Sequence, residues 1–199
     1  MDADAIRKTA KREGETVSVK LSIIVPVYNL ENDVSRTLDS LLPIRFSHDY
    51  EIIVVNDGST DASEAVIAGY QEKTDKIRLF TIENGGASNA RNVGIGYAQG
   101  QYITFMDGDD TVEPDFYEKA VSEMDAGGYD FVQGNHQKIY EDRVVPCVLV
   151  AYDEVIADRK EMLGHYLDVD HKTISYGVWG KVFREDIVRR IPFNAALAC

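Results

Sequence analysis

Short apolar runs alternate with segments of helical periodicity from Leu21 onward, and this alternation restricts the fold more than any other feature of the sequence. The pattern is typical of a parallel β-sheet whose strands are connected by crossover helices. The almost unbroken aliphatic run at residues 21–27 suits a strand that is buried on both faces. Strands are predicted at residues 21–27, 50–55, 77–82, 101–106 and 129–133.

Apolar residues at helical spacing predict a helix in each connection between these strands. The first helix occupies residues 30–42. The second is expected to begin near Asp61, which forms a capping pattern with Glu64 three positions later. The third covers residues 87–98, and the fourth begins at Pro114 and ends at Gly127 and Gly128.

One α/β domain is expected, because 199 residues with 44% hydrophobic residues suffice for a single sizeable core. Residues 1–18 are predicted to be an N-terminal extension of this domain. After about residue 135 the β-α pattern loosens. A strand is predicted at residues 144–150, a helix at 159–167, and at 174–182 a loop that passes into another element.

The formal net charge of −13 argues against a nucleic-acid-binding protein, whose surface must neutralise many phosphates. A small anionic ligand remains compatible with this charge, because a metal ion can reverse the sign of the local field. Cys147 and Cys199 have no metal-ligand spacing and form no disulfide framework. The sequence shows neither a signal peptide nor an apolar run of membrane-spanning length, which predicts a soluble, cytoplasmic protein.

Ligands of an open parallel sheet gather at the carboxyl ends of the strands, where the loops converge and helix N-termini point their N–H groups at the crevice. The segments that follow the first four predicted strands are rich in small and polar residues. We therefore expect them to share one rim of the sheet. They are residues 26–29, 56–61, 83–88 and 107–110.

The strongest local signal is a group of three carboxylates in four positions, Asp107, Asp109 and Asp110, directly after an apolar strand. Mg²⁺ or Mn²⁺ typically takes one or two carboxylates together with phosphate oxygens and water. Gly108 would let the backbone approach a ligand closely. The alternative is an Asp-rich turn closed by Asx hydrogen bonds. An EF-hand is excluded, because Val112 stands where its loop needs glycine.

Three further residues in these loops have chemistry that suits a nucleotide. The Asp57 carboxylate could accept a hydrogen bond from a base N–H, or could serve only as a turn or N-cap residue. The Tyr28 ring could stack on a base or simply pack against the protein. Arg91 is placed to meet an anion or a base edge. Gly94 and Gly96 are expected to allow close packing of the third helix on the sheet.

The segments at residues 23–29, 55–61, 85–92 and 107–110, in this order and spacing, resemble the family 2 glycosyltransferases with the GT-A fold. The resemblance extends over about residues 19–193. It implies a Rossmann-like, mostly parallel sheet flanked by helices. It also implies a nucleotide-sugar-binding part at about residues 19–134 and an acceptor-side part at about 135–199 that is truncated at its end.

The resemblance also implies roles for individual residues. Asp109 would be the main ligand of Mn²⁺ or Mg²⁺, with Asp107 beside it, and Trp179 and Lys181 would belong to the acceptor side, although a lone Trp could equally be a core residue. The residues implied in binding the donor nucleotide are Pro26, Val27, Tyr28, Asp57, Ser59, Asn89, Arg91, Asp107 and Gly108.

The implied activity is transfer of a sugar, with inversion, from a nucleoside-diphosphate sugar, with UDP favoured, to a sugar or lipid-linked acceptor in polysaccharide or glycoconjugate synthesis. Association with the inner face of a membrane would suit a lipid-linked acceptor. Family members usually carry an acidic general base in a Glu-Asp pair shortly after a segment like residues 191–193, and here no such pair occurs before Cys199. The alternative is therefore a nucleotide-sugar-binding module without transfer activity.

Two other classes of protein with related sheets, the nucleotidyltransferases and the signalling receiver domains, fit the sequence less well. A nucleotidyltransferase needs a basic Gly-rich loop after its first strand, and residues 29–33 are acidic. A receiver domain carries its acidic pair after the first strand, where this chain has Tyr28 and Asn29.

Overall fold

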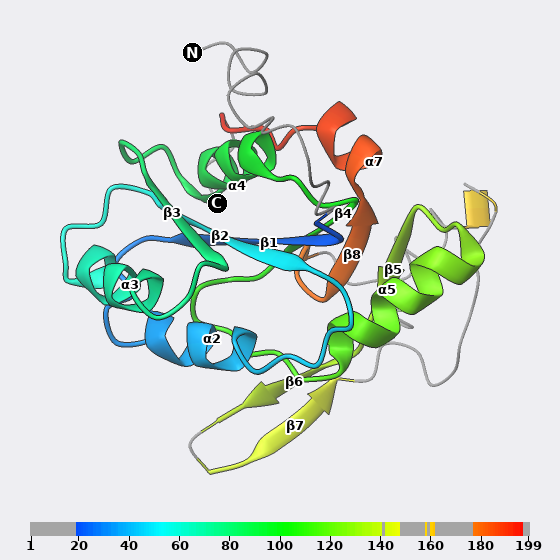
Figure 1. Cartoon of the computed structure of the whole chain (residues 1–199), viewed down its shortest axis with the longest axis horizontal. Helices are drawn as coiled ribbons and strands as arrows, with labels where there is room; N and C mark the ends of the chain where they lie inside the picture. Colours follow the sequence, from blue (N-terminus) through cyan, green and yellow to red (C-terminus); the bar gives the residue numbers. More distant parts are fainter. Residues whose placement is uncertain (1–18, 141, 148–157, 159, 162–176, 197–199) are drawn as a thin grey trace.

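The structure is a computed structural model that describes residues 19–140, 142–147, 158, 160–161 and 177–196. Its centre is a six-stranded sheet in the order β3-β2-β1-β4-β8-β5 (Figure 1). The first four strands in this order are mutually parallel, and β8 runs antiparallel to both of its neighbours. The strands of this sheet are β1 (Leu21–Val27), β2 (Tyr50–Asn56), β3 (Ile77–Thr81), β4 (Tyr102–Phe105), β5 (Phe131–Gln133) and β8 (Lys181–Arg184).

Helices cover both faces of this sheet (Figure 1). One face carries α2 (Val34–Leu41), α3 (Ser63–Gln71) and α5 (Phe116–Gly127), whose apolar residues form one core cluster with alternate residues of β1 and β2. The other face carries α4 (Ala87–Tyr97) and α7 (Glu185–Arg190), which pack on the intervening residues. Because both faces are covered, every residue of β1 and β2 is buried, as the aliphatic sequence of β1 predicts.

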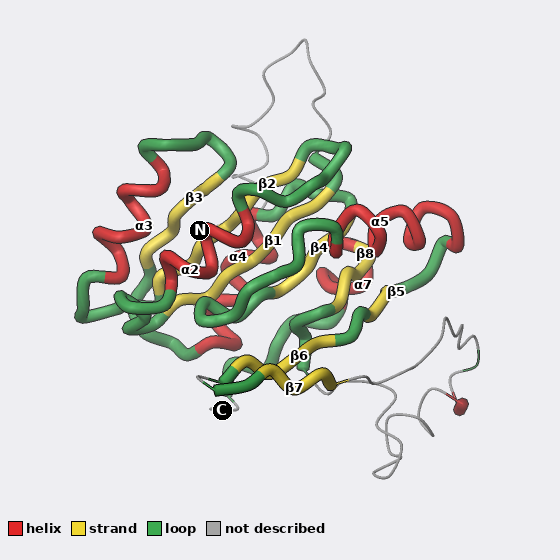
Figure 2. The backbone as a smooth tube through the Cα atoms, turned by 90° about the horizontal axis from the view of Figure 1, so that it is seen from below, coloured by secondary structure: helices red, strands yellow, loops and turns green. Residues whose placement is uncertain are grey.

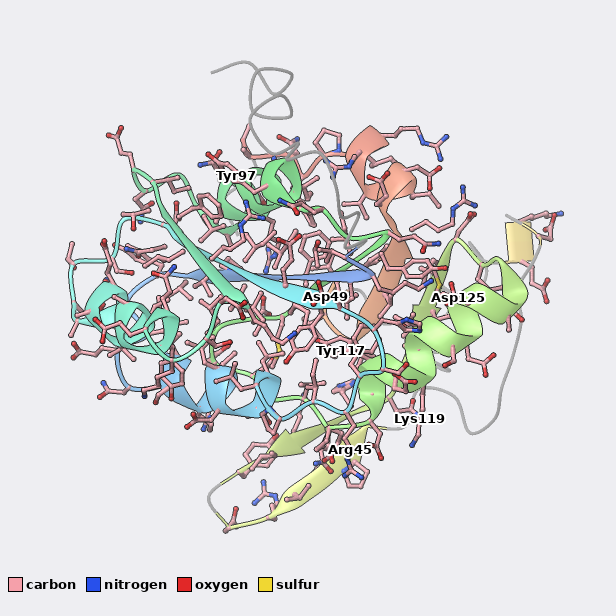
Figure 3. The ribbon with its side chains drawn as sticks, viewed as in Figure 1. Arg45, Asp49, Tyr97, Tyr117, Lys119 and Asp125 are labelled. Carbon is pink, nitrogen blue, oxygen red and sulfur yellow. The ribbon has the colours of Figure 1, made fainter. Side chains whose placement is uncertain are left out.

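Tyr117 shows how α5 is anchored to the sheet. Its side chain lies between the helix and the strands (Figure 3), and only 3% of it is exposed. The hydroxyl group contacts Sδ of Met106 at 3.9 Å, and burial raises the pKa of this phenol. A neutral, buried Tyr117 therefore packs α5 against Met106, the residue that follows β4.

The predicted succession of five strands joined by four helices is confirmed from β1 to β5, and β1 to β4 pair in parallel as expected. The sheet contains one strand more than predicted. The structure inserts β8 between β4 and β5, and its residues come from the segment that was expected to be a loop up to residue 182. The helix α7 that follows was not predicted. A strand of only four residues carries too little periodicity to be recognised, and its partner Thr104 is 77 residues away in sequence.

The predicted capping pattern before the second helix is also wrong. Asp61 accepts hydrogen bonds from the backbone N–H and the hydroxyl group of Ser63, at 3.0 and 2.5 Å, so the helix α3 begins only at Ser63. Glu64 does not turn back to the cap. Its carboxylate accepts a hydrogen bond from the Asn56 side chain at 3.0 Å, because β2 ends beside the first turn of α3.

The two glycines of α4 differ in their surroundings. A Cβ atom at Gly94 would lie 2.4 Å from Cγ2 of Ile24, whereas one at Gly96 would meet no atom within 4 Å. The close packing predicted for Gly94 is confirmed, and the same prediction for Gly96 is wrong. Gly96 is exposed because it points away from the sheet.

A separate hairpin of β6 (His136–Ile139) and β7 (Val144–Cys147) lies outside the main sheet (Figures 1 and 2). The strand predicted at residues 144–150 is confirmed as far as Cys147, and its remainder lies outside the described residues. The helix predicted at residues 159–167 falls almost entirely outside them as well. Among the helices that the structure describes, none is both long and apolar enough to cross a membrane.

Candidate functional site

A cleft of about 270 Å³ opens at the carboxyl ends of β1, β2 and β4. These three strands are parallel neighbours, so the loops that follow them meet at one rim, as the sequence predicts. Eight residues expected to bind the nucleotide or the metal line this cleft, together with Leu30 and Ala87, which were not expected. The eight are Pro26, Val27, Tyr28, Asp57, Arg91, Asp107, Gly108 and Asp109.

The ring of Tyr28 stands at the mouth of the cleft with 49% of the residue exposed. The backbone turns sharply at the next residue, since Asn29 has φ of 53°, a conformation that asparagine tolerates better than most residues. Ser59 secures this turn by accepting a hydrogen bond from the Asn29 N–H at 3.0 Å. Ser59 thus supports the Tyr28 loop from outside the cleft, and Asn89 does not line the cleft either.

Asp57 is only 3% exposed, and its carboxylate binds the loop that precedes α4. Oδ1 accepts a hydrogen bond from the Gly85 N–H at 2.9 Å, and Oδ2 accepts one from the Gly86 N–H at 2.8 Å. Each carboxylate oxygen has a further lone pair. Asp57 therefore fastens two loops of the cleft together and can still accept a hydrogen bond from a ligand.

Arg91, on α4, forms an ion pair with Asp107 at 2.8 Å across the cleft wall. The guanidinium group also lies 5.7 Å from the centre of the Phe193 ring. Its Nε atom is buried and has no hydrogen-bond partner among the described residues. The pair orients the Asp107 carboxylate, and it places a positive charge in a strongly acidic protein beside the cleft.

The loop of residues 107–110 leaves β4 in a tight turn, in which the Asp110 N–H donates to the Asp107 carbonyl at 3.1 Å. Burial, and then the negative charges of Asp109 and Asp107, raise the pKa of Asp110. A Cβ atom at Gly108 would lie 2.8 Å from Cδ1 of Leu30 and 3.1 Å from the Pro26 carbonyl. Glycine at this position thus permits close contact with the segment after β1.

Asp107 and Asp109 are the residues that could hold a divalent cation, because both line the cleft. Among the described residues, no group of three or more His, Cys, Asp and Glu side chains is arranged to hold a metal. A pair of carboxylates nevertheless fits Mg²⁺ or Mn²⁺, which completes its coordination with substrate phosphate oxygens and water. The donor set suits a metal that binds together with a diphosphate.

Trp179 and Lys181 lie beside the cleft at the end of β4 but do not line it. Trp179 forms a parallel bridge with Phe105 and packs its ring against that of His136, with 4.5 Å between the ring centres. Lys181 is 6% exposed, and its ammonium group donates to the Gly177 carbonyl at 2.6 Å. Both side chains support the backbone next to the cleft, and His136, which sequence reasoning overlooked, belongs to this support.

Burial lowers the pKa of Lys181 from its ordinary value of 10.5 to about 8, which makes the stability of the fold depend on pH. At a pH below this folded-state value both states carry the proton, so the whole cost of burying the charge is present. As the pH rises towards 10.5, the folded state loses the proton while the unfolded state keeps it, so the free energy of unfolding increases.

We expect Lys181→Met to remove this increase. Between about pH 7 and about pH 9.5, the difference in free energy of unfolding between the wild type and the variant should shift by about 1 kcal/mol or more in favour of the wild type. Urea unfolding of both proteins at several pH values measures this difference. The other titrating groups are the same in both proteins, so their contributions cancel. A difference that does not change with pH would contradict the lowered pKa of Lys181.

The mostly parallel sheet, the helices on both of its faces and the cleft at its carboxyl edge define an open α/β protein. The family model of glycosyl transferase family 2 matches residues 22–146, which is more than half of the chain. The chain therefore belongs to glycosyl transferase family 2. This confirms the resemblance of its motifs, and the mostly parallel sheet confirms the predicted fold class.

Curated relatives and solved structures agree with this assignment. The chain is 36% identical over 172 residues to the uncharacterized glycosyltransferase EpsJ of Bacillus subtilis, covering 85% of this chain and 49% of EpsJ. It is 32% identical over 183 residues to glycosyltransferase GlyA of Streptococcus pneumoniae, covering 89% of this chain and 26% of GlyA. The chain thus spans half or less of the length of these two relatives.

The crystal structure of S. aureus TarS 1–349 superimposes with a TM-score of 0.74 and 25% sequence identity, covering 91% of this chain and 52% of that one. TarS 1–349 has also been solved in complex with UDP-GlcNAc and with UDP.

Proposed function

We propose that the cleft binds a nucleoside-diphosphate sugar, with UDP as the favoured nucleotide, and that the protein transfers the sugar to an acceptor hydroxyl with inversion. The observation that carries this proposal is the convergence of Tyr28, Asp57, Arg91, Asp107 and Asp109 on one cleft of about 270 Å³. Membership of glycosyl transferase family 2 and the UDP-GlcNAc complex of TarS support it.

The positions of these residues suggest a division of roles along the donor. Tyr28 is half exposed at the mouth and offers its ring for stacking on the base. Asp57 is buried deeper and accepts a hydrogen bond from a base N–H. Asp107 and Asp109 would hold a divalent metal ion, whose charge would offset the repulsion between these carboxylates and the diphosphate.

Sugar transfer by this arrangement is a displacement at the anomeric carbon. The acceptor oxygen forms a bond to that carbon as the bond to the diphosphate oxygen breaks, and the hydroxyl proton passes to a general base. When bound, a metal ion neutralises the charge that develops on the leaving diphosphate. Arg91 holds the Asp107 carboxylate at 2.8 Å and so orients one side of this region before the donor arrives.

We further propose that residues 19–134 form the donor-binding part and that the segment from residue 135 onward forms the acceptor-side part, in which Trp179 and Lys181 support the backbone beside the cleft. The acceptor is a sugar or a lipid-linked sugar of polysaccharide or glycoconjugate synthesis, and in the second case the protein works at the cytoplasmic face of a membrane. The proposal rests on the family assignment and on the position of these two residues beside the end of β4.

Calorimetric titration with UDP, GDP and ADP tests the proposed donor site. We expect UDP to bind most tightly in the presence of Mn²⁺ and to lose most of its affinity in EDTA. Tyr28→Ala should lower the affinity for UDP about tenfold, because stacking of a base on an aromatic ring contributes about 1 to 3 kcal/mol. Equal binding of UDP by the variant and the wild type would exclude Tyr28 from the base pocket.

Transfer is tested separately from binding. With Mn²⁺, a UDP-sugar and a mixture of acceptors, a transferase releases UDP beyond the background seen without acceptor. If UDP-sugars bind but no UDP is released, the second candidate applies, namely a donor-binding module.

A further inference from the structure

The first turns of α2 hold the backbone of the loop at residues 107–110. The hydroxyl group of Thr37 lies 2.8 Å from both the Gly108 and the Asp110 carbonyl oxygens. The guanidinium group of Arg36 donates to the carbonyl between them, that of Asp109, at 2.7 Å. The single hydroxyl proton of Thr37 is shared between two carbonyl oxygens. Two successive residues of one helix thus hold three successive carbonyl groups of the acidic loop.

Thr37 is fully buried and lies in the apolar stripe of α2 between Val34, Leu38 and Leu41. A threonine inside a helix commonly directs its hydroxyl group to a carbonyl three or four residues earlier in the same helix. Here both oxygen atoms that it contacts belong to the loop some 71 to 73 residues further along the chain. The contacts with the loop, and not a hydrogen bond within the helix, therefore explain why a polar side chain lies in this apolar stripe.

The contacts determine which way the loop faces. The carbonyl groups of Gly108, Asp109 and Asp110 bind α2, while Asp107 and Asp109 are also among the residues that line the cleft. Arg91 holds the Asp107 carboxylate separately, and at the backbone of residues 108–110 the helix contacts add to the turn bond between the Asp110 N–H and the Asp107 carbonyl. Carboxylates bind a metal ion more tightly when neighbouring groups hold them in the required orientation.

We propose that Thr37 is a positioning residue for the metal site, fixing the backbone of residues 108–110 so that Asp107 and Asp109 present their carboxylates to one divalent cation. This inference rests on the proposed function of the cleft. It assigns to α2, which contributes no carboxylate to the site, control over how tightly the cation and the diphosphate bind together.

The test compares Thr37→Val, which keeps the shape of the side chain and removes the hydroxyl group, with Thr37→Ser, which keeps the hydroxyl group. We expect Thr37→Val to weaken UDP binding in Mn²⁺ about tenfold, as loss of a group supporting metal ligands does elsewhere. Binding of UDP in EDTA should stay within a factor of two of the wild type. Thr37→Ser should restore most of the affinity in Mn²⁺.

Each result of this titration decides one question. Equal UDP affinity of Thr37→Val and the wild type in Mn²⁺ would overturn the inference. An equal loss of affinity in Mn²⁺ and in EDTA would also overturn it, because a merely structural role of Thr37 weakens UDP binding under both conditions. Wild-type protein that shows no dependence of UDP binding on Mn²⁺ would instead overturn the proposed function. The thermal unfolding temperature of each variant shows whether the variant is folded under the conditions of the titration.

Arg36→Met serves as a second variant if Thr37→Val does not fold. The Arg36 side chain is 60% exposed, so its replacement should leave the fold intact. We expect a smaller weakening of UDP binding in Mn²⁺, about threefold, with no change in EDTA, because one carbonyl contact of the loop is lost. No change under either condition would count against the role of α2.

Discussion

Asp109→Asn is expected to abolish most metal-dependent donor binding, lowering the affinity for UDP in Mn²⁺ by about 100-fold or more. Asparagine keeps the size of the side chain but removes the negative charge that a hard divalent cation requires. The backbone carbonyl of residue 109 can still accept the hydrogen bond from Arg36, so the loop and the fold should remain. The variant should therefore unfold at the temperature of the wild type.

Asp110→Asn is the matched control for this prediction. Asp110 belongs to the same loop but does not line the cleft, so its substitution should change the affinity for UDP in Mn²⁺ by no more than a few fold. Calorimetry with UDP in Mn²⁺ and in EDTA measures all three proteins. Unchanged affinity of Asp109→Asn would remove Asp109 from the metal site, and equal losses in both variants would show that only the total charge of the loop matters.

Gly94→Ala is expected to destabilise the fold by about 2 kcal/mol, because an added methyl group overpacks the interface between α4 and β1. The new Cβ would lie 2.4 Å from Cγ2 of Ile24, a fully buried residue of the central strand. Neither the helix nor the strand can yield without disturbing the core around it. The higher helix propensity of alanine offsets only about 1 kcal/mol of the strain.

Gly96→Ala, two residues further along the same helix, should have the opposite effect. Its Cβ would meet no atom within 4 Å, so only the gain in helix propensity remains, and stability should rise by about 0.5 to 1 kcal/mol. Urea unfolding of both variants measures the difference. If the two substitutions shift the free energy of unfolding in the same direction, α4 does not pack on β1 as the structure shows.

Most of the cleft could be predicted, because it follows from the order of the elements. The aliphatic run of β1 and the helices after each strand indicate a parallel sheet, and a parallel sheet brings the loops after β1, β2 and β4 to one edge. Tyr28, Asp57 and Asp107 were recognised as site residues for this reason. The position of Gly94 against the sheet was recognised in the same way.

The contacts inside the cleft could not be predicted. The carboxylate of Asp57 binds two N–H groups 28 and 29 residues away, and no local pattern in the sequence points to them. Thr37 could have been noticed as a polar residue in an apolar stripe, but its partners could not. Lys181, expected to face an acceptor, proves to be buried with its ammonium group directed at a backbone carbonyl.

By itself, the sequence determined the class of fold, the edge of the sheet where the cleft opens and most of the residues that line this cleft. These follow from hydrophobic periodicity and chain order, which are local properties. Only the tertiary structure decided that β8 enters the sheet between β4 and β5, that Asp57 joins two loops, and that α2 holds the acidic loop. Such pairings join residues far apart in the chain, and they are selected by the packing and hydrogen bonding of the whole fold.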